Sequence, residues 1–449
     1  MRKLLRFAIL AAFLLGAIPA SRSSAAVVPA ARETVLPNGL RVIVKPEAGQ
    51  GIVAINLVIC AGSSYEAAGQ EGAAHFLEHM LFRGSRHYPS GEAEKYIEGL
   101  GGSINAGTLR DFTHIYATLP AGAFEPALAA LSDAVLYPTL DSDEIERERA
   151  VILSEIARHS EDARTALWDI THAVLFSNHP YGRPINGSKN AVVWLGREDL
   201  VVFHHRWYVP NNMVLVIVGD LSEARALAAA KSSFGTLERG PAAQPTGPDS
   251  ARSAQAPAQV YYHDGSLAYI ALAAKVPGIA SPRAVYALDV LQALLAQGRS
   301  SRLQVLLRES EPIASAVGAE FLTSREPSPF VIWVACAPER VGEVRTKLEQ
   351  ELAGLARGEF TAAEIAAAKR RLETAFWAVN ETYSDQADAL GFYEALDSYR
   401  SADDYVPHIR AVTPAEVRDA VRAYLTEKNT VWLTLLPRPG KRAAADEGE

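Results

Sequence analysis

The residues best suited to chemistry are His75, Glu78 and His79, which lie in an otherwise apolar stretch, residues 71–82. This stretch has few helix breakers after Gly72 and is apolar around most of its circumference, which predicts a buried helix. At about 100° per residue, the three polar side chains share one face, and the two histidines are one turn apart. Two imidazoles in this arrangement can bind one metal ion.

A helix of this kind suits a hydrolase. A zinc ion held by three side chains keeps its fourth position open for water, and the Glu78 carboxylate could take the proton of that water. The order His-x-x-Glu-His is the inverzincin pattern. Because the chain has eleven histidines, a chance match is expected in about one in a hundred such sequences. The alternative is a pair of core histidines hydrogen-bonded to Glu78.

A third ligand is expected from the acidic helix that follows Asp141. Asp141 is a good capping residue, and Glu148 and Glu155 lie seven residues apart, on nearly the same face. An acid-rich helix can also be a solvated face paired with neighbouring arginines. Glu155, however, follows the apolar residues 151–153, and an anionic ligand suits Zn²⁺. We therefore predict that Glu155 completes the site.

The chain begins like a secretory protein. Basic residues precede an apolar run over residues 7–18, and small residues follow up to residue 26, as in a signal peptide. We expect residues 1–26 to be removed on export, with periplasmic localisation. An uncleaved anchor is the alternative. The net charge of -8 becomes more negative without this basic segment, which disfavours binding to nucleic acid or to anionic membranes.

The rest of the chain divides into two similar parts. Residues 27–236 contain the motif, and residues 237–258, rich in Pro, Ala, Gly and Ser, predict a linker. Residues 259–438 repeat the strand and helix pattern of the first part but lack the His-x-x-Glu-His motif, and residues 439–449 are a polar tail. We expect strands over residues 52–60, 103–108, 113–119, 212–219 and 267–276, and helices over residues 90–100, 124–136, 222–233 and 281–295.

Together these features resemble the M16 family of zinc peptidases, in a short two-domain bacterial form. The resemblance extends from residue 36 to about residue 436. In this family the third ligand follows the second histidine by about seventy-six residues, which is the spacing from His79 to Glu155. The segments that carry the resemblance are residues 61–66, 75–80, 100–106 and 208–220, with Glu148 and Glu155.

The resemblance implies an α+β fold of two homologous domains, each a largely antiparallel sheet packed with helices, that enclose a cavity. It implies one Zn²⁺ per chain, with Glu78 as the general base of peptide hydrolysis. Glu148 would orient a ligand histidine or tune the site.

The resemblance also places the substrate. Residues 103–107, including Asn105 and Ala106, would form an edge strand that binds an extended peptide or unfolded polypeptide through backbone hydrogen bonds. The alternative for Asn105 is a simple turn residue.

One position departs from the family. Many active members carry an Arg and, seven residues later, a Tyr that contact the substrate carbonyl. Arg308 matches the Arg, but Ser315 stands at the Tyr position. Because a serine side chain is shorter than that of tyrosine, Ser315 is not expected to donate a hydrogen bond directly to the oxyanion. Such a hydrogen bond can be worth about 3 kcal/mol.

The family implies a way to complete the site. Short members often pair with a partner M16-like subunit that lacks zinc, so we expect a heterodimer in which the partner supplies the Arg and Tyr function. A homodimer is the alternative assembly. The alternative function is that of a non-catalytic peptide-binding or assembly subunit.

Overall fold

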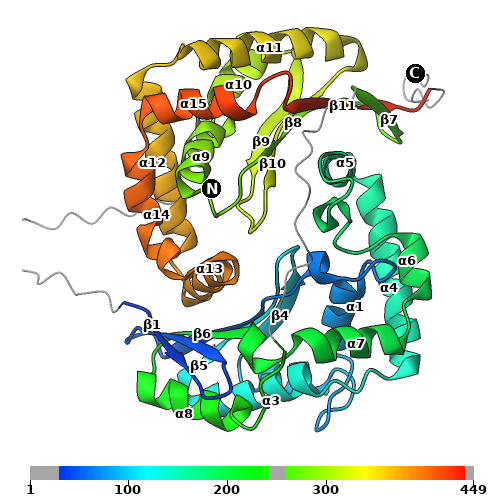
Figure 1. Ribbon diagram of the computed structural model, residues 1–449, viewed down its shortest axis with the longest axis vertical. Coiled ribbons are helices and arrows are strands. Elements are labelled where there is room, and N and C mark those ends of the chain that lie inside the picture. Colours follow the sequence, from blue (N-terminus) through cyan, green and yellow to red (C-terminus); the bar gives the residue numbers. More distant parts are fainter. Residues whose placement is uncertain (1–29, 242–257, 440–449) are drawn as a thin grey trace, which may run out of the picture.

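The computed structural model describes residues 30–241 and 258–439. The expected signal peptide, most of the expected linker and nearly all of the expected polar tail lie outside these residues. Within them the chain forms two sheets packed with helices, one below the other in Figure 1. Among the described helices, none combines the length and the apolar character needed to cross a bilayer.

The first sheet has six strands, and all neighbours are antiparallel except β2 and β6, which run parallel. Strand β4, which the family resemblance predicts to bind the substrate, lies at one edge of this sheet. In β5, alternate residues such as Ile115 and Leu119 face a helix-covered core. In spatial order the strands are β1 (Arg32–Val35), β2 (Arg41–Pro46), β6 (Met213–Gly219), β3 (Ile52–Ile59), β5 (Thr113–Pro120) and β4 (Ser103–Thr108).

The second sheet repeats the first without a counterpart of β1. Its first and last strands along the chain run parallel, and the remaining neighbours are antiparallel. If the strands of each half are numbered in chain order, from β2 in the first half and from β7 in the second, the two sheets have the same spatial order. Strand β9, at the edge of the second sheet, therefore corresponds to β4. The expected α+β fold of two related halves is confirmed. The spatial order is β7 (Gln259–His263), β11 (Thr430–Pro437), β8 (Ala268–Val276), β10 (Ser328–Cys336) and β9 (Ala314–Phe321).

Helices cover one face of each sheet and form a separate core with it. The core of the first sheet is shared with α1 (Ala73–Met80), α2 (Glu92–Gly99), α3 (Phe124–Leu136), α4 (Ser142–Glu161), α6 (Lys189–Trp194), α7 (Arg197–Trp207) and α8 (Glu223–Phe234). The core of the second sheet is shared with α9 (Pro282–Ala296), α10 (Arg302–Gln304), α11 (Val341–Arg357), α12 (Ala362–Val379), α14 (Arg400–Ala411) and α15 (Pro414–Tyr424).

The two halves exchange one helix each. Helix α13 (Tyr383–Leu396), from the second half, packs on β3 and β6 of the first sheet, where Leu390 shares a cluster with Val58. Helix α5 (Ala163–Leu175), from the first half, packs on β8 and β11 in the same way, and both helices are visible beside the opposite sheet in Figure 1. The sequence of β6 is apolar without alternation, which is typical of a strand buried on both faces.

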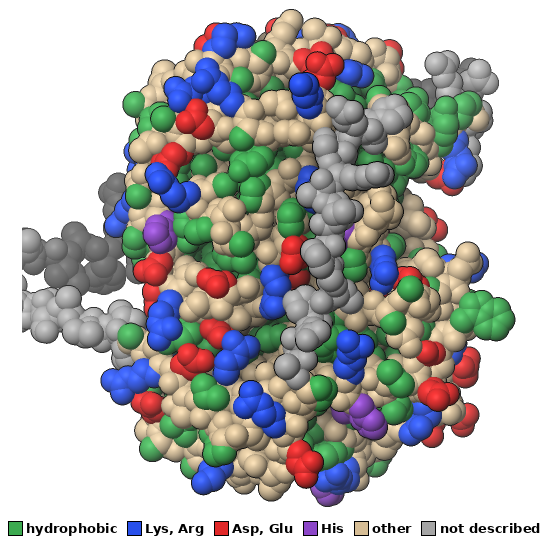
Figure 2. All heavy atoms as spheres, viewed as in Figure 1, with side chains coloured by type: hydrophobic (Ala, Val, Ile, Leu, Met, Phe, Trp, Pro, Cys, Tyr) green, Lys and Arg blue, Asp and Glu red, His purple; other side chains and the backbone are tan. Residues whose placement is uncertain are grey.

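The face shown in Figure 2 carries Lys and Arg interspersed with Asp and Glu. The described part of this face therefore has no broad basic surface of the kind that binds nucleic acid.

Candidate metal centre

Helix α1 is held at its start by the buried carboxylate of Glu66. Its two oxygens accept hydrogen bonds from the backbone N–H groups of Gly72 (3.0 Å) and Ala74 (2.9 Å). Burial raises the pKa of Glu66, and these two hydrogen bonds oppose that effect. Sequence reasoning gave Glu66 no role, because a residue this far before a helix is outside the usual capping position. The interaction fixes the direction in which α1 enters the site.

The apolar residues of α1 point into the core, and its polar face points toward α4. Phe76, Leu77 and Met80 are fully buried, whereas His75 and His79 remain partly exposed. This division follows from the helical period, which separates the two sets by position around the axis. The metal-binding face predicted from the sequence is therefore directed toward the helix that carries Glu155.

The three expected ligand residues converge. The Oε2 atom of Glu155 lies 3.9 Å from His75 Nε2 and 3.6 Å from His79 Nε2. One ligand atom from each residue lies within 4.8 Å of the other two, and no second such group of His, Cys, Asp or Glu occurs among the described residues. Bonds of about 2.0–2.2 Å in a tetrahedral zinc site place ligand atoms about 3.4 Å apart. The arrangement fits a zinc ion in both donor type and spacing.

The second nitrogen of His79 is held by Glu148. His79 Nδ1 lies 3.0 Å from Glu148 Oε2, and Glu148 Oε1 accepts a hydrogen bond of 2.7 Å from Arg83 Nε. A carboxylate in this position fixes the proton on Nδ1 and leaves the Nε2 lone pair for a metal ion. Burial alone would lower the pKa of His79, but the interactions with Glu148, Glu155 and Glu78 raise it overall.

His75 has a different environment. Its Nδ1 is buried and has no hydrogen-bond partner among the described residues. Burial, followed by the neighbouring His79 and His159, lowers the pKa of His75 to about 3. The imidazole is therefore neutral at ordinary pH, which is the form that binds metal ions.

Glu78 is positioned by the edge strand of the sheet. Thr108, the last residue of β4, donates a hydrogen bond of 2.6 Å from Oγ1 to Glu78 Oε2. Burial raises the pKa of Glu78, and the bond from Thr108 opposes this rise. Sequence reasoning did not identify Thr108, because a threonine at a strand end carries no distinguishing pattern. The bond joins β4 to α1, the helix that carries the two histidines predicted to bind a metal ion.

Asn105 and Ala106 both lie within β4, so the turn alternative for Asn105 is wrong. Asn105 pairs with Tyr116 of β5 and is exposed. Its Oδ1 accepts a hydrogen bond of 2.8 Å from the backbone N–H of Ala106. The two residues therefore lie on the free edge strand that leads to Glu78.

Arg308 and Ser315 lie in the second half. Arg308 is exposed in a short π-helix, Val305–Glu309, and its Nη1 donates to Gln304 Oε1 at 3.1 Å. Ser315 is exposed on β9, the edge strand of the second sheet. The hydrogen bond of Arg308 is therefore made within its own helical turn and does not connect Arg308 to the candidate metal centre.

The chain is similar to known peptidases along most of its length. Residues 41–189 match the family model described as Insulinase (Peptidase family M16), and residues 195–372 match the one described as Peptidase M16 inactive domain. An uncharacterized zinc protease of Mycobacterium tuberculosis is 31% identical over 92% of this chain and 95% of its own length. The zinc protease PqqE of Helicobacter pylori is 28% identical, over 94% of this chain and 97% of its own length.

Solved structures show the same fold. A protease from Helicobacter pylori aligns with a TM-score of 0.86 at 24% identity, over 91% of this chain and 100% of that chain. A peptidase M16 inactive domain from Pseudomonas fluorescens aligns with a TM-score of 0.82 at 23% identity, over 91% of this chain and 98% of that chain.

Proposed function

Because this chain belongs to the M16 family of peptidases, we propose that it is a zinc-dependent endopeptidase that hydrolyses extended peptides or unfolded polypeptides. The observation that carries the proposal is the convergence of His75, His79 and Glu155 beside the carboxylate of Glu78. Two imidazoles and one carboxylate form a ligand set typical of catalytic zinc sites.

In the proposed reaction the chain binds the metal ion and moves one proton. His75, His79 and Glu155 would hold the ion, which when bound supplies Lewis acidity and lowers the pKa of water. Glu78, anchored at Oε2 by Thr108, accepts the proton of the attacking water at Oε1. The same carboxyl group then delivers the proton to the leaving amine.

The substrate would bind as an additional strand along β4. This strand is at the sheet edge, and its end contacts Glu78 through Thr108. Backbone pairing at an edge accepts many side chains, which suits a peptidase for unfolded chains. The Ala106 N–H, now bonded to Asn105 Oδ1, would become available when the Asn105 side chain turns away.

We further propose that a second M16-like subunit completes the site. The support is Ser315, which stands where the family pattern has Tyr, and the exposed position of Arg308. We also propose export to the periplasm, on the basis of the signal-peptide pattern in residues 1–26.

The direct test is cleavage of an unstructured quenched peptide by the purified chain lacking residues 1–26 and loaded with zinc. Glu78→Gln is expected to keep one zinc ion and to lose at least about 100-fold in turnover. Glu98→Gln, which alters an exposed carboxylate on α2, serves as the control and should match the unaltered chain. Unchanged turnover in Glu78→Gln would reject the assignment of the base.

The same experiment tests the partner. If the chain binds zinc but cleaves slowly, addition of the partner subunit should restore turnover. Full turnover by the homogeneous chain alone would contradict the need for a second subunit.

A further inference from the structure

A cavity of about 510 Å³ lies in the first half, between the end of α4, the start of α5 and residues 184–189. Its volume falls in the range of about 300–1,000 Å³ that is typical of ligand sites. It adjoins the candidate metal centre, because Ile156 and His159 of its wall follow Glu155 on α4 within about one turn. The proposed reaction gives this cavity no role.

The cavity holds two opposite charges that do not pair directly with each other. Arg110, from the turn between β4 and β5, and Asp169 of α5 both line it. The charge of each shifts the pKa of the other, so the two groups are close. They nevertheless form no ion pair in the described chain. A ligand that carries both charges could bridge the two groups.

The guanidinium group of Arg110 is fixed by neutral acceptors. Its Nε donates to the backbone oxygen of Tyr181 at 3.0 Å, and its Nη2 donates to that of Arg183 at 3.5 Å. Its Nη1 has no hydrogen-bond partner among the residues that the structure describes. Burial lowers the pKa of Arg110 to about 10, so the group stays charged at neutral pH. A charged guanidinium with a free N–H suits a carboxylate.

The carboxylate of Asp169 also lacks a direct partner. Asp169 is half-buried, and no described residue donates a hydrogen bond to its side chain. Burial raises the pKa of Asp169, whereas the nearby Arg110 and His159 oppose that rise. A carboxylate withdrawn from water without a donor is costly. The ammonium group of a ligand would supply the missing donor.

The rest of the wall is mostly apolar. Trp168 and Ile185 provide its larger surfaces, and a bound aromatic or aliphatic side chain would be buried against them. The smaller polar contributions come from hydroxyl and amide groups and from Lys189 at the exposed end of the segment. The remaining apolar residues of the wall are Ile156, Ala166, Ile170 and Pro184.

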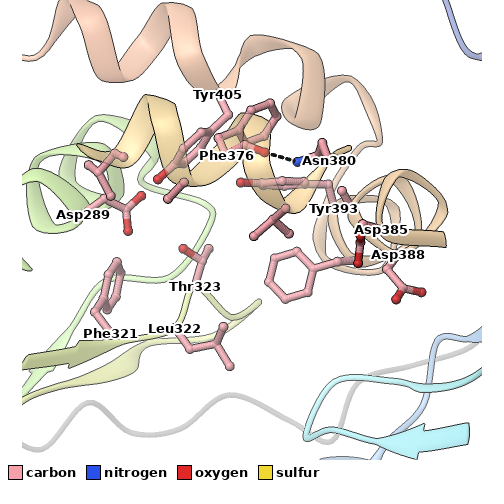
Figure 3. A pocket seen from close by; sticks show the side chains of 15 residues that line it. Asp289, Phe321, Leu322, Thr323, Phe376, Asn380, Asp385, Asp388, Tyr393 and Tyr405 are labelled. Atoms are coloured by element: carbon pink, nitrogen blue, oxygen red, sulfur yellow. Dashed lines mark hydrogen bonds between the residues drawn. The ribbon is translucent and has the colours of Figure 1, made fainter. Parts of the chain in front are cut away.

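The cavity drawn in Figure 3 lacks this combination of charges. It measures about 460 Å³ and lies in the second half, between α9, α12, α13 and α14. Its charged residues are Asp289, Asp385 and Asp388, and none of the described residues that line it is Lys, Arg or His. Asp289 already accepts a hydrogen bond from the phenol of Tyr405. That cavity therefore offers no group for the carboxylate of a ligand.

We propose that the cavity beside α4 binds a zwitterion with an apolar body, either a free amino acid or a dipeptide. Its carboxylate would accept hydrogen bonds from Arg110, its ammonium group would donate to Asp169, and its side chain would lie against Trp168 and Ile185. The proposal goes beyond the peptidase function and concerns binding alone, so either of the two can fail while the other stands.

The charges of the ligand are tested by calorimetric titration of the zinc-loaded chain. L-phenylalanine is compared with 3-phenylpropionate, which lacks the ammonium group, and with phenethylamine, which lacks the carboxylate. We expect the zwitterion to bind at least about tenfold more tightly than either. L-leucyl-L-phenylalanine is titrated in parallel, and the tighter of the two zwitterions identifies the length of the ligand. If neither zwitterion binds more tightly than the singly charged compounds, the proposal is overturned.

The place of binding is tested with variants. Asp169→Asn should remove the advantage of the zwitterion over 3-phenylpropionate, whereas the control Asp403→Asn, which alters an exposed carboxylate on α14, should retain it. Ile185→Trp narrows the cavity without a change of charge and should weaken binding at least about tenfold. It also decides the matter if Asp169→Asn does not fold. Because an amino acid can also bind a metal ion, unchanged affinity in these two cavity variants would place the zwitterion elsewhere and refute the proposed site.

Discussion

His79 Nδ1 and Glu148 Oε2 lie 3.0 Å apart, although 69 residues separate them in the chain. The contact joins α1 to α4 through one ring nitrogen of His79, while the other, Nε2, lies 3.6 Å from Glu155 Oε2. The orientation of the His79 ring, a proposed metal ligand, therefore depends on Glu148, which would not itself contact the metal ion.

Replacement of Glu148 should weaken zinc binding. Glu148→Gln replaces the carboxylate with an amide, which binds the Nδ1–H less strongly and can present its own N–H to the ring. We expect zinc affinity to fall by about 10–100-fold, measured by competition with a chelating dye. Glu146→Gln, an exposed change on the same helix, should leave the affinity unchanged. Equal affinities in both variants would contradict the role of Glu148.

Removal of the Thr108 hydroxyl should slow turnover without loss of zinc. Thr108→Val keeps the shape of the side chain but removes the hydrogen bond to Glu78 Oε2. A bond to a charged group is worth about 1.5–3 kcal/mol, so kcat should fall by about 10–100-fold while bound zinc stays at one per chain. Thr118→Val, on the neighbouring strand β5, is the control. A normal kcat in Thr108→Val would show that Glu78 needs no support from β4.

Zinc should stabilise the folded chain because the proposed ligands join two helices. At a free zinc concentration about 100 times its Kd, the free energy of unfolding should rise by about 2.7 kcal/mol, measured by urea denaturation. Chelation should reverse the increase. Glu78→Gln should keep the effect and His79→Leu should lose it. A zinc effect that survives in His79→Leu would place the ion elsewhere.

Asp289 should make stability depend on pH. Burial raises the pKa of Asp289 from 3.8 to about 7 in the folded chain, so the folded state holds this proton more tightly than the unfolded state. Its contribution to stability is complete below about pH 4 and is lost as the pH rises through about 7. The free energy of unfolding of the unaltered chain, minus that of Asp289→Asn, should therefore fall between pH 4 and 8. For the control Asp403→Asn, the difference in the free energy of unfolding from the unaltered chain should not change over this pH range. A difference for Asp289→Asn that also does not change with pH would refute the prediction.

Because each half packs one of its helices on the sheet of the other half, the two halves should unfold together. Val58 is fully buried on β3 and shares a cluster with Leu390 of α13. Val58→Ala should lower the free energy of unfolding by about 2 kcal/mol, and fluorescence and circular dichroism should report one common transition. Val202→Ala, at a position 53% exposed on α7, should change it by less than about 0.5 kcal/mol. Two separate transitions would show that α13 does not join the halves.

Much of the local structure follows from the sequence alone. The helix expected over residues 71–82 is α1, Ala73–Met80, and Asp141 caps α4 by accepting from the N–H groups of Asp143 and Glu144. The repetition of the strand and helix pattern in the second half is also expected from the sequence, and the structure shows it. These predictions succeed because helical and strand periods, and the capping preferences of short polar side chains, act within a few residues.

The spacing of His75, Glu78 and His79 along the chain is enough to predict that they share one face of α1, because the helical period fixes their relative directions. The residues that support these side chains come from distant parts of the chain and are apparent only in the folded protein. Glu66 at the start of α1, Thr108 at Glu78, and the crossing of α13 onto the first sheet depend on how distant elements pack. Such contacts arise from burial of both faces of a sheet and from pairing of buried polar groups, and no local period encodes either.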